Sequence, residues 1–219
     1  MQKDIIEEMY TSKDTQYFNL EREIFKNAVT IKGIKILDIG CGTGALGSFF
    51  KNEQQCEVYG IEINESAFRE ANKNLNHVIK ANVEIIDLPY EDCFFDVIIL
   101  GDVLEHLISP VNTINKLLKV LKPGGKIYIT VPNIRYWRVI LDLVIKDDWE
   151  YKGWGILDYT HLRFFTKRSI VNLMRKNDIK VIDSQWVIQK PSKSHFINLV
   201  TLKFFNGFLA SHCFVTLQK

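Results

Sequence analysis

The sequence has few cysteines, and their spacing argues against the usual structural zinc site. Four cysteines occur among 219 residues, and none belongs to a Cys-x-x-Cys pair. Common zinc sites draw their ligands from such close pairs. Unpaired thiols instead suit a reducing compartment. The four residues are Cys41, Cys56, Cys93 and Cys213.

Long apolar runs and a strong charge of either sign are missing as well. No apolar run approaches the roughly 18–20 residues that span a bilayer, and the acidic first eight residues lack the apolar core of a signal peptide. With free thiols, these absences predict a cytoplasmic protein without a membrane span. The net charge of +2 gives no global field to capture a nucleic-acid backbone, so nucleic acid is not an expected partner.

Segments typical of strands and helices alternate along the chain. Such alternation indicates βαβ units, and therefore a parallel sheet that helices cover on both faces. The predicted strands are residues 34–40, 57–62, 78–83, 95–100, 126–131, 180–188 and 213–218. The predicted helices are 45–52, 65–75, 111–121 and 167–176. Asn64 and Thr166 are expected to cap two of them, because their side chains accept from N–H groups of a first turn.

The length and pattern predict a single domain over residues 1–219 with two additions to the sheet. Residues 1–30 form a helical cap. Residues 133–165 have no clean period and are expected to be an insert or lid on the substrate side. Within them, 134–145 suits an amphipathic surface helix, although Arg135-Tyr136-Trp137-Arg138 also fits a recognition patch for sugars, bases or phosphate. An apolar stripe in 196–208 suits a core or homodimer contact better than a membrane surface.

A glycine-rich loop follows the first predicted strand. The run Gly40-Cys41-Gly42-Thr43-Gly44-Ala45 fits the loose G-x-G-x-x-G/A pattern of dinucleotide-binding folds. Asp38 stands two residues before it, where its carboxylate would lie close to a bound pyrophosphate. Two like charges about 4 Å apart repel by roughly 4 kcal/mol at an effective dielectric of 20. Asp38 therefore favours a ligand that is cationic at this point, such as the ammonium and sulfonium of S-adenosylmethionine.

Glu62 ends the second predicted strand, about twenty residues beyond the loop. An acid in that register can accept from both hydroxyls of a ribose, whichever nucleoside cofactor is bound. Glu62 thus indicates a nucleoside, and Asp38 indicates which one. The alternative, a solvated carboxylate at a strand end, does not account for the register with the loop.

The motifs in this order resemble the class I S-adenosylmethionine-dependent methyltransferases over about residues 30–132. The segments that carry the resemblance are Asp38-Ile39-Gly40-Cys41-Gly42-Thr43-Gly44, Glu62, Asp87-Leu88-Pro89-Tyr90, Phe95-Asp96-Val97-Ile98-Ile99, Asp102-Val103-Leu104-Glu105-His106 and Leu121-Lys122-Pro123-Gly124-Gly125. The resemblance implies a Rossmann-like, doubly wound α/β fold. Its seven-stranded sheet would be mostly parallel, with the last strand antiparallel and helices on both faces.

The resemblance also implies which residues bind the donor, S-adenosylmethionine. Its methionine end would meet Asp38, Gly40, Cys41, Gly42, Gly44, Gly101 and Asp102; its ribose would meet Glu62; its adenine would meet Asn82 and Val83; and Ile63, next to Glu62, would also contact the donor. The family often has Asp where this chain has Asn82, whose amide can still accept from the adenine amino group.

The acceptor is less well determined. Methyl transfer from a sulfonium is an in-line displacement that depends on positioning, and a hydroxyl acceptor also loses a proton to a base. His161 and His106 are the candidate catalytic bases, each with a structural alternative. Asp102, Glu105, His106 and His161 are also similar to the metal site of small-RNA 2′-O-methyltransferases, but Asp replaces the first Glu there, and we assign no metal.

Residues 158–166 are similar, more loosely, to bacterial methyltransferases of surface-polysaccharide pathways. We therefore expect O-methylation of a small molecule or of a sugar or glycan hydroxyl. The alternatives are a non-catalytic donor-binding regulator or partner protein and a metal-assisted RNA 2′-O-methyltransferase. The Asn/Asp-Pro-Pro-Tyr/Phe clamp of N-methyltransferases is absent, because Gly101-Asp102-Val103-Leu104 follows the fourth predicted strand.

Overall fold

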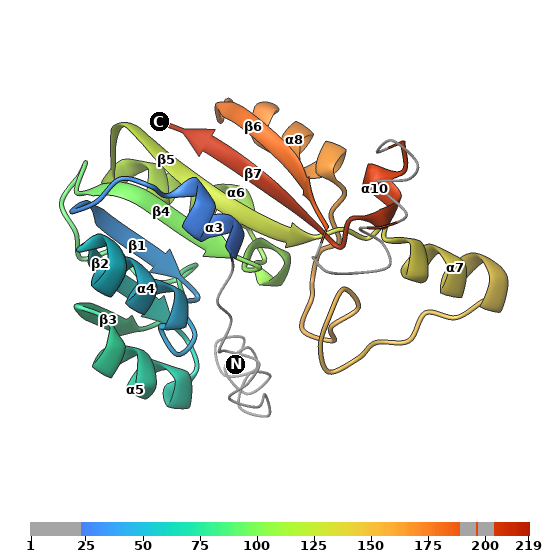
Figure 1. Ribbon diagram of the computed structural model, residues 1–219, viewed down its shortest axis with the longest axis horizontal. Coiled ribbons are helices and arrows are strands. Elements are labelled where there is room, and N and C mark those ends of the chain that lie inside the picture. Colours follow the sequence, from blue (N-terminus) through green and yellow to red (C-terminus); the bar gives the residue numbers. More distant parts are fainter. Residues whose placement is uncertain (1–22, 189–195, 197–203) are drawn as a thin grey trace.

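A seven-stranded sheet runs through the centre of the computed structural model, which describes residues 23–188, 196 and 204–219 (Figure 1). The strand order is β3-β2-β1-β4-β5-β7-β6. The bounds are β1 Lys35–Ile39, β2 Glu57–Glu62, β3 His77–Lys80, β4 Phe95–Gly101, β5 Leu121–Pro132, β6 Val181–Val187 and β7 His212–Gln218.

The sheet is mostly parallel, with one antiparallel strand. Strands β1 to β5 pair in parallel, and β7 is antiparallel to both β5 and β6. The strand order reverses beside β1, between β1 and β4, which is where open α/β sheets bind ligands at the carboxyl ends of their strands. The predicted Rossmann-like, doubly wound sheet with an antiparallel last strand is confirmed.

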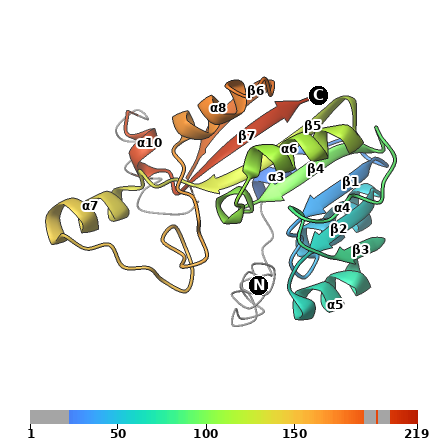
Figure 2. The ribbon, with the colours of Figure 1, turned by 180° about the vertical axis from the view of Figure 1, so that it is seen from behind.

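Helices cover both faces of the sheet, as predicted. Helices α3, α4 and α5 lie on the face toward the viewer in Figure 1, and α6 and α8 lie on the opposite face, seen in Figure 2. Because side chains alternate along a strand, Val97 and Ile99 of β4 pack under the first set and Ile98 and Leu100 under the second. The bounds are α3 Glu23–Ala28, α4 Ala45–Gln54, α5 Glu65–Asn74, α6 Pro110–Val120 and α8 Lys167–Arg175.

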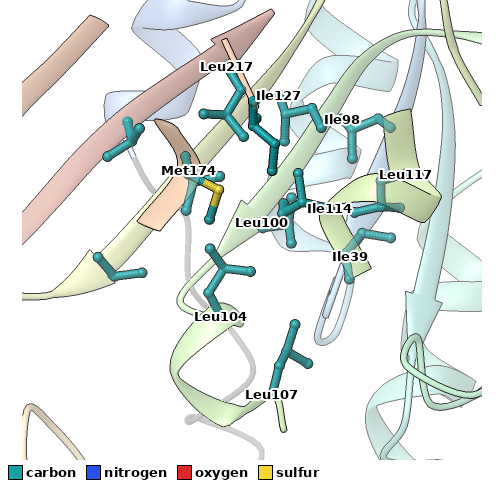
Figure 3. Packing of buried hydrophobic residues seen from close by; sticks show 14 of the residues in the cluster. Ile39, Ile98, Leu100, Leu104, Leu107, Ile114, Leu117, Ile127, Met174 and Leu217 are labelled. Atoms are coloured by element: carbon teal, nitrogen blue, oxygen red, sulfur yellow. The ribbon is translucent and has the colours of Figure 1, made fainter. Parts of the chain in front are cut away.

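The apolar layer under α6 and α8 extends to the turn after β4. Leu104 of the short 3-10 helix η1, Leu104–His106, is fully buried and lies with Leu107, Leu100 and Ile114 (Figure 3). This packing fixes the backbone of η1, which carries Glu105 and His106. The hydrophobic core therefore sets the position of two residues that the sequence analysis selected.

Both predicted helix caps are confirmed. The Asn64 side chain accepts a hydrogen bond from Ala67 N at 2.9 Å, and Thr166 Oγ1 accepts from Ser169 N at 3.0 Å. The predicted helix 111–121 is observed as α6, which ends at Val120, and β5 begins at once. Residues 122–125 bulge out of β5, since its register against β4 shifts between Phe95 and Val97, as suits a proline that cannot donate a ladder bond.

An arm projects beyond the ends of β5 and β7. It contains α7, Trp137–Lys146, in place of the predicted surface helix 134–145, and α10, Asn206–Leu209, lies beside its base (Figure 1). Of α7, Val139 is buried, whereas Trp137 and Ile140 are half-buried. The outer apolar side chains of the arm are exposed, namely Leu141, Leu143, Val144, Ile145, Trp149, Tyr151 and Trp154.

Two expectations fall largely outside the described residues. Of the cap over residues 1–30, the structure describes 23–30, and of the stripe in 196–208 it describes Phe196 and 204–208. Within the described part of the chain, no helix has the length and apolar character that crossing a membrane requires.

Candidate active site

The glycine loop joins β1 to α4 at the carboxyl edge of the sheet. Gly40 N and Cys41 N both donate to Ile61 O of β2, at 2.8 and 3.3 Å. Gly40 has φ 64°, a left-handed conformation that favours glycine, and a Cβ there would lie 2.8 Å from Val103 Cγ2. The loop is thereby held against β2 and against the turn that follows β4.

Glu62 is the anchor of this loop. Its carboxylate is buried and accepts from Gly42 N at 2.8 Å through Oε2, and from Ile63 N and Asn64 N at 2.9 and 2.8 Å through Oε1. Burial raises the pKa of Glu62, although the three backbone N–H groups oppose that shift. A carboxylate offers about four acceptor sites, so the backbone uses most of them, and the contact to both ribose hydroxyls stays a prediction.

Asp38 and Glu62 together make the loop electronegative. Both carboxylates are buried, Asp38 to 4% exposure and Glu62 to 3%. Burial raises the pKa of the Cys41 thiol well above its usual value, and the charges of Asp38 and Glu62 raise it further. Two buried acids beside a neutral thiol suit a ligand that carries positive charge here, in agreement with the argument made from Asp38.

Gly60 is a residue that the sequence analysis missed. It lies on β2 opposite Asp38 of β1, and a Cβ at this position would lie 2.6 Å from Cys41 Sγ. Any larger residue would therefore displace the loop. Glycine inside a predicted strand is the sequence signal that marks such close approach.

The structure places Asn82 and Val83 just past β3 but does not test their contact with adenine. Asn82 Oδ1 accepts from Glu84 N at 2.8 Å, so the amide caps a local turn. The Val83 side chain is buried in the core, and its carbonyl accepts from the Lys116 ammonium. The predicted strand 78–83 ends earlier, at Lys80, because residues 82–86 turn instead.

Gly101 and Asp102 lie at the end of β4, and their contact with the methionine end of the donor stays a prediction. Asp102 has φ 52° and donates its N–H to Thr130 at 3.2 Å to O and 3.1 Å to Oγ1. Its Oδ2 lies 3.3 Å from Nε2 of His212. The sequence analysis did not select His212, because no motif surrounds the start of the last strand.

The two predicted bases, His106 and His161, lie together. Their ring centroids are 4.7 Å apart. His106 Nδ1 lies 3.1 Å from Thr160 O and His161 Nδ1 lies 3.0 Å from Ile156 O. A carbonyl oxygen only accepts, so each Nδ1 carries a proton. Burial, followed by the neighbouring His161, lowers the pKa of His106 to about 4.

Glu105 completes a compact cluster with this pair. The ligating atoms of Glu105, His106 and His161 all lie within 4.8 Å of one another, and His161 Nε2 is 3.9 Å from Glu105 Oε1. The sequence analysis named Asp102 as a fourth member, but its carboxylate faces His212 instead. Within the described residues, the group that could hold a metal therefore consists of Glu105, His106 and His161.

The insert is bound to the turn after β4 by backbone contacts. Glu105 O accepts from Leu162 N at 2.9 Å and from Arg163 N at 3.0 Å. The Arg163 guanidinium donates to the carbonyls of Leu107 and Ile108. Asp158, which is buried, accepts from Thr160 N at 2.9 Å. These contacts set the position of His161, and the role of the insert as a lid stays a prediction.

Comparison with known proteins identifies the family. A family model described as a methyltransferase domain matches residues 14–184. The chain is 23% identical over 175 residues to the ubiquinone biosynthesis O-methyltransferase of Coxiella burnetii strain RSA 331, covering 77% of this chain and 73% of the relative. It is 25% identical over 178 residues to the enzyme of that name from Idiomarina loihiensis, covering 76% and 70%. These relatives are not polysaccharide-pathway enzymes.

Solved structures share the fold at low sequence identity. A SAM-dependent methyltransferase from Archaeoglobus fulgidus superposes with a TM-score of 0.68 at 15% identity, covering 99% of both chains. The [4+2]-cyclase SpnF superposes with a TM-score of 0.63 at 18% identity, covering 96% of this chain and 86% of the other. Because one of these is named as a cyclase, the fold alone does not determine the reaction.

The lowered pKa of His106 predicts that stability falls on acidification. Unfolded histidine has a pKa of about 6.5. Between pH 6.5 and about 4, this side chain therefore binds a proton in the unfolded chain but not in the folded one, and lowering the pH favours unfolding. The loss from this group is on the order of 3 kcal/mol. Urea unfolding across this range should show a shallower decline for His106→Gln than for the unsubstituted chain. Parallel curves would contradict the assignment.

The order of the motifs, the electronegative loop at the strand-order reversal and the family match over most of the chain all agree. The chain belongs to the methyltransferase-domain family and is an S-adenosylmethionine-dependent methyltransferase.

Proposed function

We propose that this enzyme methylates a hydroxyl group of a small molecule. The observation that carries the proposal is the placement of three histidines, His106, His161 and His212, beside the end of β4, next to the predicted methionine side of the donor. A hydroxyl acceptor needs a proton acceptor there, whereas the sulfonium itself needs only an in-line approach. The curated relatives, named as O-methyltransferases, support the same reaction class.

The surface near the histidine pair favours an acceptor with a ring and apolar character. Phe164 lies 6.3 Å from the ring of His161, and Trp149 lies 5.5 Å from Phe164, edge to face. Tyr151 lies 6.4 Å from Phe164. This series of rings leads from the exposed arm to the buried His161. Flat apolar rings of this kind pack well against a phenol or catechol, and ubiquinone biosynthesis is the process for which the relatives are named.

A sugar or glycan hydroxyl remains the alternative acceptor within the same reaction. Aromatic faces also stack on sugars, and Arg138 lies over the ring of Trp137 at 5.3 Å, at the base of the arm. A chain that binds the donor without transferring a methyl group is the alternative outside catalysis, and the SpnF likeness shows that the fold serves other reactions.

A metal-assisted reaction is a second candidate, and the Glu105–His106–His161 cluster favours it. Histidines that ligate metals usually donate their other ring N–H to a backbone carbonyl, and both histidines do so here. A divalent ion held there would lower the pKa of an acceptor hydroxyl. RNA as the acceptor has less support, because the net charge of +2 leaves little attraction for phosphates.

Acceptor screening with labelled S-adenosylmethionine tests the proposal. We expect label in phenols and catechols, and none in RNA or amines. Label found mainly in nucleotide sugars or glycans would select the alternative acceptor. Donor binding without transfer to any hydroxyl would contradict the proposed function and support the non-catalytic alternative.

Chelation distinguishes the two routes to the same product. With a metal at the cluster, EDTA should abolish transfer, Mn²⁺ or Mg²⁺ should restore it, and Glu105→Gln should raise the metal concentration needed. Removing a residue that only hydrogen-bonds to a metal ligand typically costs about 10–100-fold in metal affinity. Loss of Glu105, a ligand itself, should cost at least that much. Donor affinity, measured by calorimetry, should not change. Transfer that is indifferent to EDTA rules out the metal-assisted candidate.

A further inference from the structure

A third histidine stands at the carboxyl edge of the sheet, outside the pair that the sequence analysis selected. His212 begins β7, where it pairs in register with Pro132 of β5 and Val187 of β6. Because β7 is antiparallel, its first residue lies at the edge where β4 and β5 end. There His212 Nε2 meets Asp102 Oδ2 at 3.3 Å.

The contacts of His212 determine which ring nitrogen is basic. Nε2 faces a carboxylate oxygen, which only accepts, so this nitrogen carries the proton. Nδ1 lies 3.0 Å from Ser211 Oγ, whose hydroxyl can donate to it. His212 is therefore held with its lone pair on Nδ1, and an acceptor hydroxyl would reach that nitrogen by taking the place of the Ser211 hydroxyl.

Asp102 is the charged group that the structure places against His212. Within the described part of the chain, the neighbours of His212 in register, Pro132 and Val187, carry no ionisable side chain. An imidazolium at this point would form an ion pair with the Asp102 carboxylate. His106 is different, because burial and then the second imidazole beside it lower its pKa.

His212 is also the more accessible group. Its side chain is 26% exposed, whereas that of His161 is 4% exposed. Asp102 has the left-handed φ of 52° and its N–H is bonded to Thr130, so the carboxylate stands at the end of β4 on a fixed backbone. The pair thus joins the predicted donor side to a partly open surface.

We propose that His212, oriented by Asp102, is the base that takes the proton from the acceptor hydroxyl; this role rests on the proposed function. The acceptor oxygen forms a bond to the methyl carbon as the carbon–sulfur bond of the sulfonium breaks, which leaves a neutral thioether. The hydroxyl proton passes to Nδ1 of His212. The resulting imidazolium pairs with Asp102 and later releases its proton to solvent. His106 and His161 then hold the insert or a metal.

Substitution by glutamine separates this role from a structural one. The Gln amide nitrogen can occupy the place of Nε2 and still donate to Asp102, but it cannot accept a proton. We expect His212→Gln to lower single-turnover methyl transfer by about 10²–10⁴-fold, as His212→Ala should, with unchanged donor affinity. In the unsubstituted enzyme, the rate of methyl transfer should rise with pH as the base loses its proton. In His212→Gln this rise should disappear.

The controls and contrary outcomes are distinct. His77→Gln, an exposed change on β3, should keep the rate and the pH profile. If His212→Gln is active where His212→Ala is not, His212 only positions Asp102 and the proposal is overturned. The same conclusion follows if either variant loses donor affinity in proportion to its loss of rate. An active His212→Gln enzyme would overturn this role alone, whereas an unsubstituted chain that binds the donor but methylates no hydroxyl overturns the proposed function with it.

Nitrogen-15 NMR of the unsubstituted protein tests the geometry without an acceptor. We expect neutral His212 to carry its proton on Nε2, and Asp102→Asn to weaken that preference. A proton found on Nδ1 would contradict the proposal.

Discussion

The buried carboxylate of Glu62 is the interaction on which the donor site depends. It ties the glycine loop after β1 to the backbone that follows β2, through N–H groups of Gly42, Ile63 and Asn64. Asn64 then caps α5. One acid thus fixes the loop, the strand end and the start of a helix. An unsatisfied buried carboxylate would be costly, so the loop is pre-organised before any ligand binds.

The same arrangement gives the site its chemical preference. Asp38 and Glu62 place two buried carboxylates around Cys41, and Gly60 leaves room for that side chain. Anionic surroundings disfavour a pyrophosphate and favour a sulfonium with its ammonium group. On the far side of the strand-order reversal, Asp102 stands at the end of β4 and meets His212. Under the proposed function, the donor and acceptor groups therefore meet at the end of this central strand.

Local patterns predicted most of the fold, because the hydrophobic periodicity and the capping residues of βαβ units are visible within short segments of sequence. Asn64 and Thr166 were predictable for this reason, as was the place of Glu62 against the loop from its register. The ligand contacts of Asp38 and Glu62 stay predictions. The residues that sequence reasoning missed are joined by contacts distant along the chain. His212 meets Asp102 only because β7 inserts antiparallel beside β5. Leu162 and Arg163 carry no local signal either, because hydrogen bonds to Glu105 O and Leu107 O, far away along the chain, hold them in place.

The central claim is that buried acids select a cationic nucleoside donor over a dinucleotide. Calorimetric titration of the unsubstituted chain and of Asp38→Ala with S-adenosylmethionine and with NAD tests it most directly. We expect S-adenosylmethionine to bind the unsubstituted chain, NAD to give no heat, and Asp38→Ala to weaken the first interaction strongly. Equal affinity for the two ligands, or S-adenosylmethionine binding that Asp38→Ala leaves unchanged, would contradict the account.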